Sequence, residues 1–409
     1  MNTRLSKILQ LLSGVAVVLT LASAAVAQPP TGTVKKLVLK STVLGEERTV
    51  LIRTPVGYES NQARYPVLYM TDGDAHMGHT ASTIEFLVQN GRIPDLIVVG
   101  VTNTDRTRDL TPAKSTDKTP GGELRFPTSG GADNFLKFFE TELIPQIDQQ
   151  YRVQPYRILA GHSLGGLFAI HAMISKPGLF NSYIAVSPSL QWEHDEALKR
   201  AEAYLKNQKE MKATSLFVSI GNEPGAIGAD FDSFKELLSK TKIKGFEWQG
   251  ERMADEDHGS VVLRSHYFGL RKIYDGWQVP SDPKSGAVLG GLNGADAHYK
   301  KLSEKFGYTI PVPEQLINQM GYQFLFDNKP DDAIAVFKAN VERYPNSANV
   351  YDSLAEAYER GGRIDLAEPL YDKARTLGQQ NNDPNAAIYK TNYERAHAKL
   401  KETQGTKKQ

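Results

Sequence analysis

A serine with a glycine two positions away on each side marks the most informative segment of the chain. Residues 161–165 read Gly-His-Ser-Leu-Gly; they follow the short apolar run Arg157–Ala160 and precede a stretch typical of a helix. This strand–turn–helix pattern predicts a nucleophile elbow, in which a sharp turn lifts the hydroxyl of Ser163 above a sheet. The start of the helix would direct backbone N–H groups at a developing oxyanion. The segment therefore predicts nucleophilic catalysis by Ser163.

A serine nucleophile requires a general base, because its free hydroxyl reacts poorly at neutral pH. Among the nine histidines, only His258 follows the last predicted strand, Phe246–Met253, and precedes an apolar helix. In enzymes with a nucleophile elbow the base occupies that position, in the chain order serine, acid, histidine. We therefore expect His258 to be the base. His162 adjoins the nucleophile, but strand-and-turn geometry predicts that it points away and packs.

The acid that orients the base is expected after the preceding strand, Leu216–Ile220. Glu223 lies there in Gly-Asn-Glu-Pro, and a glutamate can hold the imidazole tautomer as an aspartate does. Asp230 and Asp255 are the alternatives. Glu223 is the predicted acid.

The oxyanion hole is expected to combine two backbone N–H groups. Leu164 supplies the first, and the loop after the Val67–Thr71 strand supplies the second, for which the amide of Asp74 is favoured. Two carboxylates of this loop, with His76 and His79, could instead suggest a metal site. Their spacing is mixed and no second ligand cluster accompanies them, so we predict neither a metal nor an organic cofactor.

Short apolar runs alternate with helical stretches from Pro66 to Trp277. The runs are Val67–Thr71, Leu96–Val101, Arg157–Ala160, Tyr183–Ser187, Leu216–Ile220 and Phe246–Met253, and the helical stretches are Ser82–Asn90, Asp133–Tyr151, Leu164–Ser175, Asp195–Lys209 and Asp232–Lys240. With a hairpin over Val34–Arg53, the pattern predicts eight strands in a mostly parallel sheet with helices on both faces. This α/β class is the α/β-hydrolase fold, with Ser163 after the fifth strand. The Gly/Pro/Thr-rich insertion Asp105–Gly131 is expected to form a wall or lid of the site.

A Pro/Gly/Ser-rich stretch, Pro280–Gly294, predicts a domain boundary, and the sequence beyond it repeats. Gly321, Phe324, Ala333, Phe337 and Pro345 recur 34 residues later as Ala355, Tyr358, Ala367, Tyr371 and Gln379. Four of these five pairs keep a small or aromatic character, which indicates tetratricopeptide-like helix pairs. We expect an esterase domain over 34–277, a linker and docking segment over 278–313 that packs through Tyr299–Pro313, and helical repeats without catalytic residues over 314–400.

Residues 1–27 have the pattern of a secretory signal peptide. Arg4 and Lys7 precede the apolar run Ile8–Val26, which ends in an Ala-Val-Ala site. An uncleaved membrane anchor is the alternative, because the run approaches spanning length. Cleavage would leave no stable membrane span, would change the net charge from +1 to −1 by removing these two cations, and predicts a periplasmic or secreted protein.

The composition excludes other functional classes. The net charge of +1 and the absence of a long basic run argue against a nucleic-acid partner. The chain has no cysteine, so it can form no disulfide and carry out no thiol chemistry. The expected partner is a small-molecule ester, and the C-terminal repeats are a candidate contact surface for a protein or peptide.

Five segments in order resemble the family of α/β-hydrolases known as putative esterases. They are 69–74 (Tyr-Met-Thr-Asp-Gly-Asp), 106–112 (Arg-Thr-Arg-Asp-Leu-Thr-Pro), 161–166 (Gly-His-Ser-Leu-Gly-Gly), 187–189 (Ser-Pro-Ser) and 257–260 (Asp-His-Gly-Ser). The family includes siderophore esterases, S-formylglutathione hydrolases and feruloyl-type esterases, and the resemblance covers about residues 34 to 276. It implies that Ser163 and His258 are nucleophile and base. It does not assign the acid, because some siderophore esterases of the family work without a well-placed carboxylate.

These features predict a serine carboxylic-ester hydrolase that forms an acyl-enzyme, with a siderophore-type or other bulky ester as its substrate. Two alternatives remain at the level of sequence. One is an inactive hydrolase-fold scaffold that binds through its helical repeats. The other is an acyltransferase that uses the same acyl-enzyme.

Overall fold

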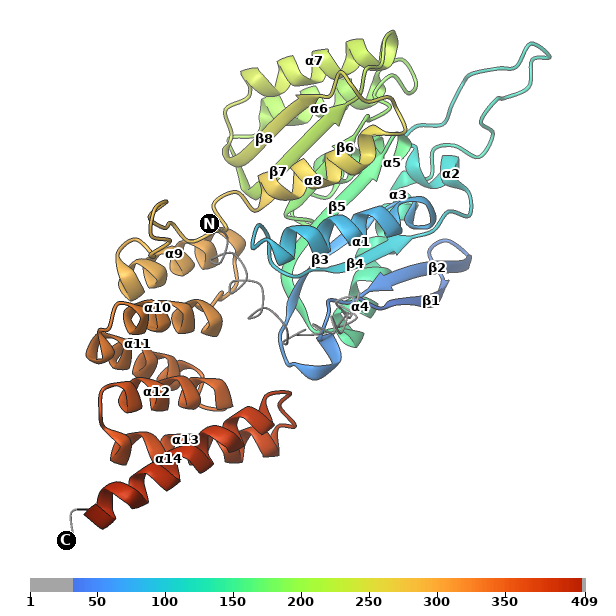
Figure 1. The fold of residues 1–409 in the computed structure, drawn as a ribbon. Helices are drawn as coiled ribbons and strands as arrows, with labels where there is room; N and C mark the ends of the chain where they lie inside the picture. Colours follow the sequence, from blue (N-terminus) through green and yellow to red (C-terminus); the bar gives the residue numbers. More distant parts are fainter. Residues whose placement is uncertain (1–31, 407–409) are drawn as a thin grey trace, which may run out of the picture.

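The computed structural model describes residues 32–406, and Figure 1 shows a sheet-containing unit followed by a stack of helices. The expected signal peptide, 1–27, lies outside the described residues. Eight strands form one sheet in the order β1-β2-β4-β3-β5-β6-β7-β8. They are β1 (Val34–Ser41), β2 (Glu46–Arg53), β3 (Tyr65–Met70), β4 (Ile97–Val101), β5 (Val153–His162), β6 (Ser182–Val186), β7 (Glu210–Ile220) and β8 (Lys244–Arg252). β1 and β2 pair antiparallel, β2 pairs antiparallel with β4, and the other neighbours are parallel. The predicted α/β-hydrolase fold is confirmed.

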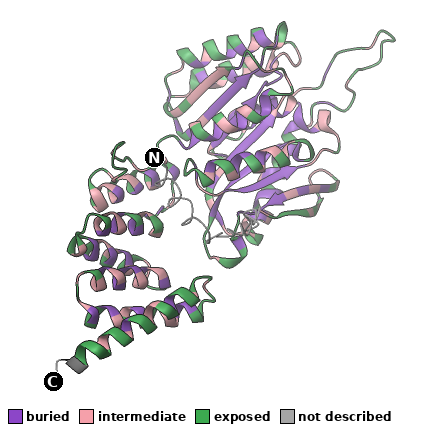
Figure 2. Ribbon diagram, viewed as in Figure 1, coloured by how far each residue is buried: buried purple, intermediate pink, exposed green. Residues whose placement is uncertain are grey.

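Alternating side chains of the central strands pack against two separate layers of helices. On β3, Leu68 and Met70 face the layer of α1 (Gly73–Gln89) and α8 (Val261–Ile273). Val67 and Tyr69 of the same strand face the opposite layer. The period of two along a strand is the reason why one short apolar run supplies both faces. Figure 2 shows the buried strands between the helices, whose outer faces are exposed.

The second layer contains the helices that the sequence places between the other strands. They are α3 (Ala132–Phe138), a π-helical turn (Phe139–Leu143), α4 (Ile144–Gln150), α5 (Leu164–Ser175), α6 (Glu196–Asn207) and α7 (Ala226–Lys240). The segment expected to form a wall or lid, Asp105–Gly131, begins with the short helix α2 (Arg106–Leu110) and then extends outward in Figure 1. Its aromatic anchor is Phe126, whose ring lies 5.2 Å from that of Trp192. Trp192 also donates its indole N–H to the carbonyl of Ala113.

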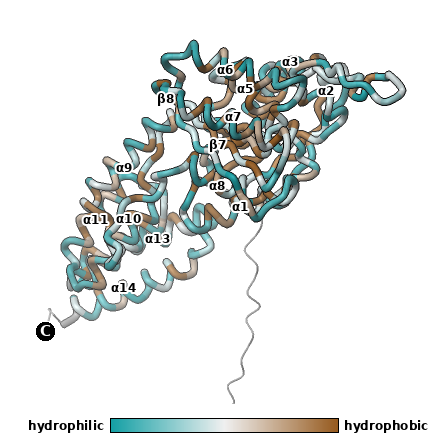
Figure 3. The backbone as a smooth tube through the Cα atoms, turned by 90° about the horizontal axis from the view of Figure 1, so that it is seen from above, coloured by the Kyte–Doolittle hydropathy of each residue, from teal (hydrophilic) through white to brown (hydrophobic). Residues whose placement is uncertain are grey.

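Six helices follow α8 among the described residues: α9 (Gly291–Phe306), α10 (Glu314–Phe326), α11 (Pro330–Arg343), α12 (Ala348–Arg360), α13 (Ile364–Gln380) and α14 (Ala386–Thr406). Residues 34 positions apart are in contact between successive helix pairs: the hydroxyl of Tyr322 on α10 donates to Glu356 on α12 at 2.9 Å. A Cβ at Gly321 would overlap the ring of Phe337, so the small residue is what lets α10 and α11 approach closely. Figure 3 shows short apolar stretches alternating with hydrophilic ones along these helices.

The helical stack is joined to the sheet unit by an aromatic cluster. Phe306 on α9 stacks on Tyr274 with ring centroids 5.0 Å apart and meets Tyr156 of β5 edge-on, also at 5.0 Å. Trp277 completes the cluster. Helix α9 lies within the stretch 278–313 that we expected to be a linker and docking segment. Its apolar positions Ala295, Tyr299, Leu302 and Phe306 have helical spacing and were the signal for it.

This cluster predicts different outcomes for two truncations. A chain that ends at Pro313 keeps Phe306 and should retain its kcat on a small aryl ester. A chain that ends at Trp277 exposes the rings that Phe306 covers and should be less stable by about 3–5 kcal/mol, as for removal of a large core side chain. Urea unfolding, followed by kcat for the folded fraction, would test both. A folded Pro313 chain without turnover would show that the repeats complete the active site.

Candidate active site

The side chains singled out by the sequence meet at one edge of the sheet, where the parallel strands end. Asp72 follows β3, Ser163 follows β5, Ser187 follows β6, Glu223 follows β7 and His258 follows β8. Parallel strands bring their carboxyl ends to the same edge, so residues far apart in the sequence become neighbours there. The topology therefore assembles the candidate site.

Ser163 occupies the strained turn that an elbow requires. Its backbone has φ 60° and ψ −116°, a conformation that non-glycine residues rarely adopt. A Cβ at Gly161 would overlap the carbonyl of Gly165, and a Cβ at Gly165 would overlap the hydroxyl of Thr71. Gly161 therefore lets β5 and the start of α5 approach closely, and Gly165 lets α5 lie against Thr71 after β3, so that the serine is held in this conformation.

His258 and Glu223 form a close pair. The imidazole Nδ1 lies 2.5 Å from Glu223 Oε2, and the other carboxylate oxygen accepts hydrogen bonds from the Ser187 hydroxyl at 2.6 Å and the Gly221 N–H at 3.2 Å. The Glu223 side chain is buried. Because an ionised carboxylate can only accept, Nδ1 carries the proton and Nε2 is left with a free lone pair.

The two alternative acids lie elsewhere. Asp255 is exposed and forms an ion pair with Arg264 at 2.6 Å. Asp230 lies within α7, where burial and the nearby Asp195 raise the pKa of its carboxyl group. Of the three carboxylates that the sequence left open, Glu223 is the one that the structure brings to His258.

The hydroxyl of Ser163 has a partner that the sequence did not indicate. Its Oγ lies 3.3 Å from Oγ of Ser189, which is the hydrogen-bond partner found for it among the described residues. The Ser-Pro-Ser segment was the signal, but nothing in its pattern gave Ser189 a role. The His258 side chain is 43% exposed, so the imidazole can be reached by a ligand that enters from solvent.

The two backbone N–H groups predicted for the oxyanion hole both lie at the start of a helix. Leu164 is the first residue of α5 and Asp74 is the second residue of α1, positions whose N–H groups have no partner within their own helix. Asp72, with φ 54°, makes the turn that leads into α1. This arrangement has the components of an oxyanion hole.

The turn at Asp72 is fixed by Arg106. The guanidinium donates to both carboxylate oxygens of Asp72, at 2.6 and 3.1 Å, and to the carbonyl of His162 at 3.0 Å. Burial alone would raise the pKa of Asp72, but the hydrogen bonds and charge of Arg106, with a hydrogen bond from Asn103, lower it overall. Arg106 thus joins the loop of Asp74 to the nucleophile elbow. Sequence reasoning assigned it no role.

A group of four histidines lies close to the site: His76 and His79 on α1 and His162 at the end of β5 are partly buried, and His266 on α8 is fully buried. Ring centroids are 5.6 Å apart for His162 and His76, 5.1 Å for His76 and His79, and 5.7 Å for His79 and His266. Burial lowers the pKa of all four imidazoles, and lowers that of His162 to about 4. Within residues 32–406 no group of three or more potential ligands has the arrangement of a metal site.

These histidines should make the folded protein less stable as the pH falls. Their pKa values are lower in the folded state than the ordinary value of about 6.5, so the unfolded chain takes up protons first. The free energy of unfolding should therefore decrease from about pH 6.5 toward about pH 4, where His162 itself becomes protonated. Urea unfolding at about pH 7 and 5 would measure this decrease, and a His76→Asn variant should show a smaller one. Equal stability at the two pH values would contradict the prediction.

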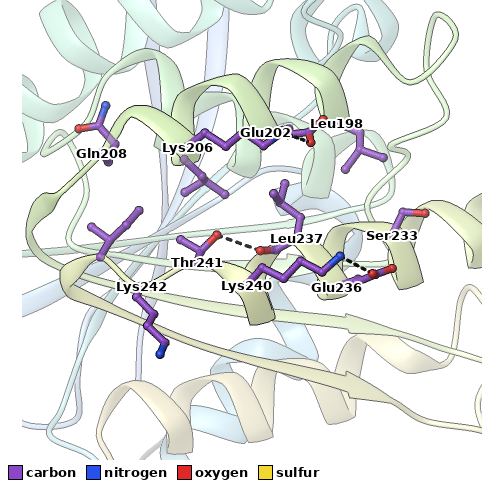
Figure 4. A pocket seen from close by; sticks show the side chains of 12 residues that line it. Leu198, Glu202, Lys206, Gln208, Ser233, Glu236, Leu237, Lys240, Thr241 and Lys242 are labelled. Atoms are coloured by element: carbon purple, nitrogen blue, oxygen red, sulfur yellow. Dashed lines mark hydrogen bonds and ion pairs between the residues drawn. The ribbon is translucent and has the colours of Figure 1, made fainter.

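The groove drawn in Figure 4 lies at the opposite edge of the sheet. It has a volume of about 610 Å³ between the ends of α6 and α7, where β7 and β8 begin. Two of its three lysines are paired with glutamates of the same helices, Lys206 with Glu202 and Lys240 with Glu236. None of its lining residues belongs to the candidate active site, so this groove is separate from that site.

Comparisons with known proteins agree with this geometry. Residues 41–259 match the family described as "Putative esterase". The ferri-bacillibactin esterase BesA of Bacillus subtilis (strain 168) is 33% identical over 220 residues, which are 49% of this chain and 75% of the relative. A siderophore triacetylfusarinine C esterase of Aspergillus fumigatus is 30% identical over 273 residues, which are 57% of this chain and 90% of the relative.

A solved structure extends the similarity to three dimensions. An IroE-like serine hydrolase from Shewanella oneidensis has a TM-score of 0.66 and 28% identity, and the match covers 76% of this chain and 100% of that chain. No helix among residues 32–406 is sufficiently long and apolar to cross a membrane. Because the family match takes in more than half of the chain and contains both the elbow and His258, the protein belongs to the "Putative esterase" family of α/β-hydrolases and is a serine esterase.

Proposed function

We propose that the protein hydrolyses bulky, siderophore-type esters through a triad of Ser163, His258 and Glu223. The observation that carries the proposal is the 2.5 Å contact between His258 Nδ1 and the buried carboxylate of Glu223. The strained backbone of Ser163, with φ 60°, supports it as the nucleophile elbow. A histidine held in this tautomer presents its other nitrogen as a base. The three side chains then have the roles of nucleophile, base and orienting acid.

The first half of the reaction forms an acyl-enzyme. Ser163 Oγ attacks the ester carbonyl carbon while His258 Nε2 takes the hydroxyl proton, and the Leu164 and Asp74 N–H groups stabilise the negative oxygen. The intermediate collapses, the C–O bond to the alcohol breaks, and the imidazolium returns its proton to the leaving oxygen. Glu223 stabilises the positive charge on the imidazole during these steps without taking the proton itself.

The second half repeats the steps with water. His258 removes a proton from a water molecule that attacks the acyl carbon, and the carboxylic acid leaves as Ser163 regains its hydrogen. An alcohol in place of water would give acyl transfer by the same steps. The exposure of the His258 side chain supports hydrolysis, since water can reach the base from bulk solvent.

The substrate class is inferred from the relatives. BesA is named for ferri-bacillibactin and the Aspergillus relative for triacetylfusarinine C, both siderophores. The open side of His258 supports a substrate larger than a simple acyl ester. The pattern of residues 1–27 supports export, and hence a periplasmic or secreted location. The repeats over 314–400 are proposed to have tetratricopeptide-like character and to be available for a protein or peptide contact.

A labelling experiment followed by an ester panel would test the proposal. A fluorophosphonate probe should attach to Ser163, as located by peptide mass spectrometry, and a cyclic trilactone siderophore should have a higher kcat/KM than p-nitrophenyl acetate. Adding a competing alcohol separates the alternatives, because an acyltransferase would give the new ester in place of the free acid. Labelling at another residue would refute the site, and preference for the small ester would refute the substrate class.

A further inference from the structure

His162 lies against the proposed base, in a position that the sequence did not predict. Its ring centroid is 4.6 Å from that of His258, with 46° between the ring planes, and its Nε2 lies 2.7 Å from the backbone carbonyl oxygen of His258. β5 extends through His162, so the side chain shares the face of Ile158 and Ala160, toward α1 and α8. The loop that carries His258 leads into α8, and the two histidines therefore meet.

The hydrogen bond has only one possible direction. A carbonyl oxygen accepts and cannot donate, so His162 must carry its proton on Nε2. The bond holds the main chain of His258, whereas Glu223 holds its side chain through Nδ1. With both ends fixed, the imidazole has little freedom to swing away from the edge of the sheet where Ser163 lies.

The same residue is tied to the nucleophile through its main chain. His162 immediately precedes Ser163, and its carbonyl oxygen accepts from Arg106 at 3.0 Å. Its side chain and its peptide thus join the base loop, the elbow and the Asp72 turn. A displacement of His162 would move the base relative to the nucleophile, and errors of about 1 Å in such geometry can cost about a hundredfold in rate.

His162 is uncharged near neutral pH, which suits a position beside a base that becomes positive during turnover. Burial lowers its pKa to about 4, with the neighbouring His258 and His76 acting in the same direction and the hydrogen bond to His258 and the charge of Asp72 opposing them. His162 is therefore neutral near pH 7 and does not repel an imidazolium on His258.

We propose that His162 is a positioning residue, which holds the His258 loop in register with Ser163 by donating its Nε2–H to the His258 carbonyl. The inference rests on the proposed role of His258 as base. His162 could hold His258 either by its hydrogen bond to the carbonyl or by the contact between the two rings, and the proposal assigns the role to the hydrogen bond. Two substitutions separate them.

The test compares His162→Gln with His162→Phe in the full-length protein. A glutamine amide can donate from nearly the place of the imidazole Nε2, whereas phenylalanine keeps an aromatic ring without a donor. We expect the glutamine variant to stay within a few-fold of wild-type kcat on p-nitrophenyl acetate. The phenylalanine variant should lose about ten- to a hundredfold in kcat with little change in KM, and should react more slowly with a fluorophosphonate by a similar factor.

A matched control is a histidine about two turns along α5 from the nucleophile. His171 on α5 is buried and bonds Asp133 through Nε2 at 2.9 Å. His171→Phe should change thermal stability but neither kcat nor the fluorophosphonate rate. If His162→Phe does not fold, His162→Leu removes the donor with less volume and serves the same comparison.

The outcomes separate the inference from the proposed function. A folded His162→Phe variant with wild-type kcat, or a glutamine variant as slow as the phenylalanine variant, would overturn the positioning role. Ser163→Ala and His258→Ala are measured in the same assay. Activity in those two variants would instead refute the triad, whatever His162 does.

Discussion

Ser163→Ala should abolish ester hydrolysis while leaving the fold intact. Removal of the nucleophile leaves only substrate binding and the oxyanion donors, so kcat should fall by about 10⁴- to 10⁶-fold. Alanine has a Cβ as serine has, so the strained backbone at φ 60° is unchanged and thermal stability should stay close to that of the wild-type protein. The measurement is kcat on an aryl ester together with a thermal unfolding curve.

The neighbouring Ser189 provides the control for this prediction. Ser189→Ala removes the hydroxyl that lies 3.3 Å from Ser163 Oγ but leaves the elbow unchanged, so a fluorophosphonate should still label Ser163. A Ser163→Ala variant that kept more than about a hundredth of wild-type activity would exclude the proposed mechanism, because the residual rate without a nucleophile is far lower.

His258→Ala should be nearly as damaging as loss of the nucleophile, and Glu223→Gln should cost less. The imidazole carries the proton in both halves of the reaction, whereas the carboxylate orients the ring and stabilises its charge. We expect a loss of about 10⁴- to 10⁶-fold for His258→Ala and of about 10⁴-fold or less for Glu223→Gln. The measurement is kcat and KM of both variants on the same aryl ester, each compared with the wild-type values.

Asp255 and Asp230 are the controls for the acid. Asp255→Asn removes an exposed partner of Arg264, and Asp230→Asn changes a carboxyl group on α7, so both variants should retain activity. If Glu223→Gln were silent and either asparagine variant were inactive, the acid would be misassigned. If none of the three mattered, the enzyme would work as a serine–histidine dyad.

The strands and the two residues proposed as nucleophile and base could be predicted from local patterns. The apolar runs predicted the cores of β3 to β7, because a strand buried on both faces is almost continuously apolar. The elbow was recognisable because only glycine tolerates the close approach at Gly161 and Gly165. His258 followed from chain order. Helix starts were less accurate: α1 begins at Gly73, not at the expected Ser82, because packing of Met77 and Thr80 outweighs the weak helix propensity of this segment.

Contacts between distant segments could not be obtained in this way. Several acidic residues had suitable positions in the sequence, and only the relative placement of β7 and β8 brings Glu223 to Nδ1 of His258. Arg106 belongs to a loop whose composition predicts irregular structure, yet it joins the Asp72 turn to the elbow. No local pattern encodes such pairings.

The sequence alone thus determined the fold class, the elbow at Ser163 and the position of His258, because these depend on periodicity, glycine sterics and chain order. Only the tertiary structure decided which carboxylate meets the imidazole, that His162 donates to the His258 carbonyl, and that Phe306 joins the helical stack to the sheet. The physical reason is that a hydrogen bond or ring contact depends on the distance between atoms to within an ångström, and for residues far apart in the chain the packing of whole layers sets that distance.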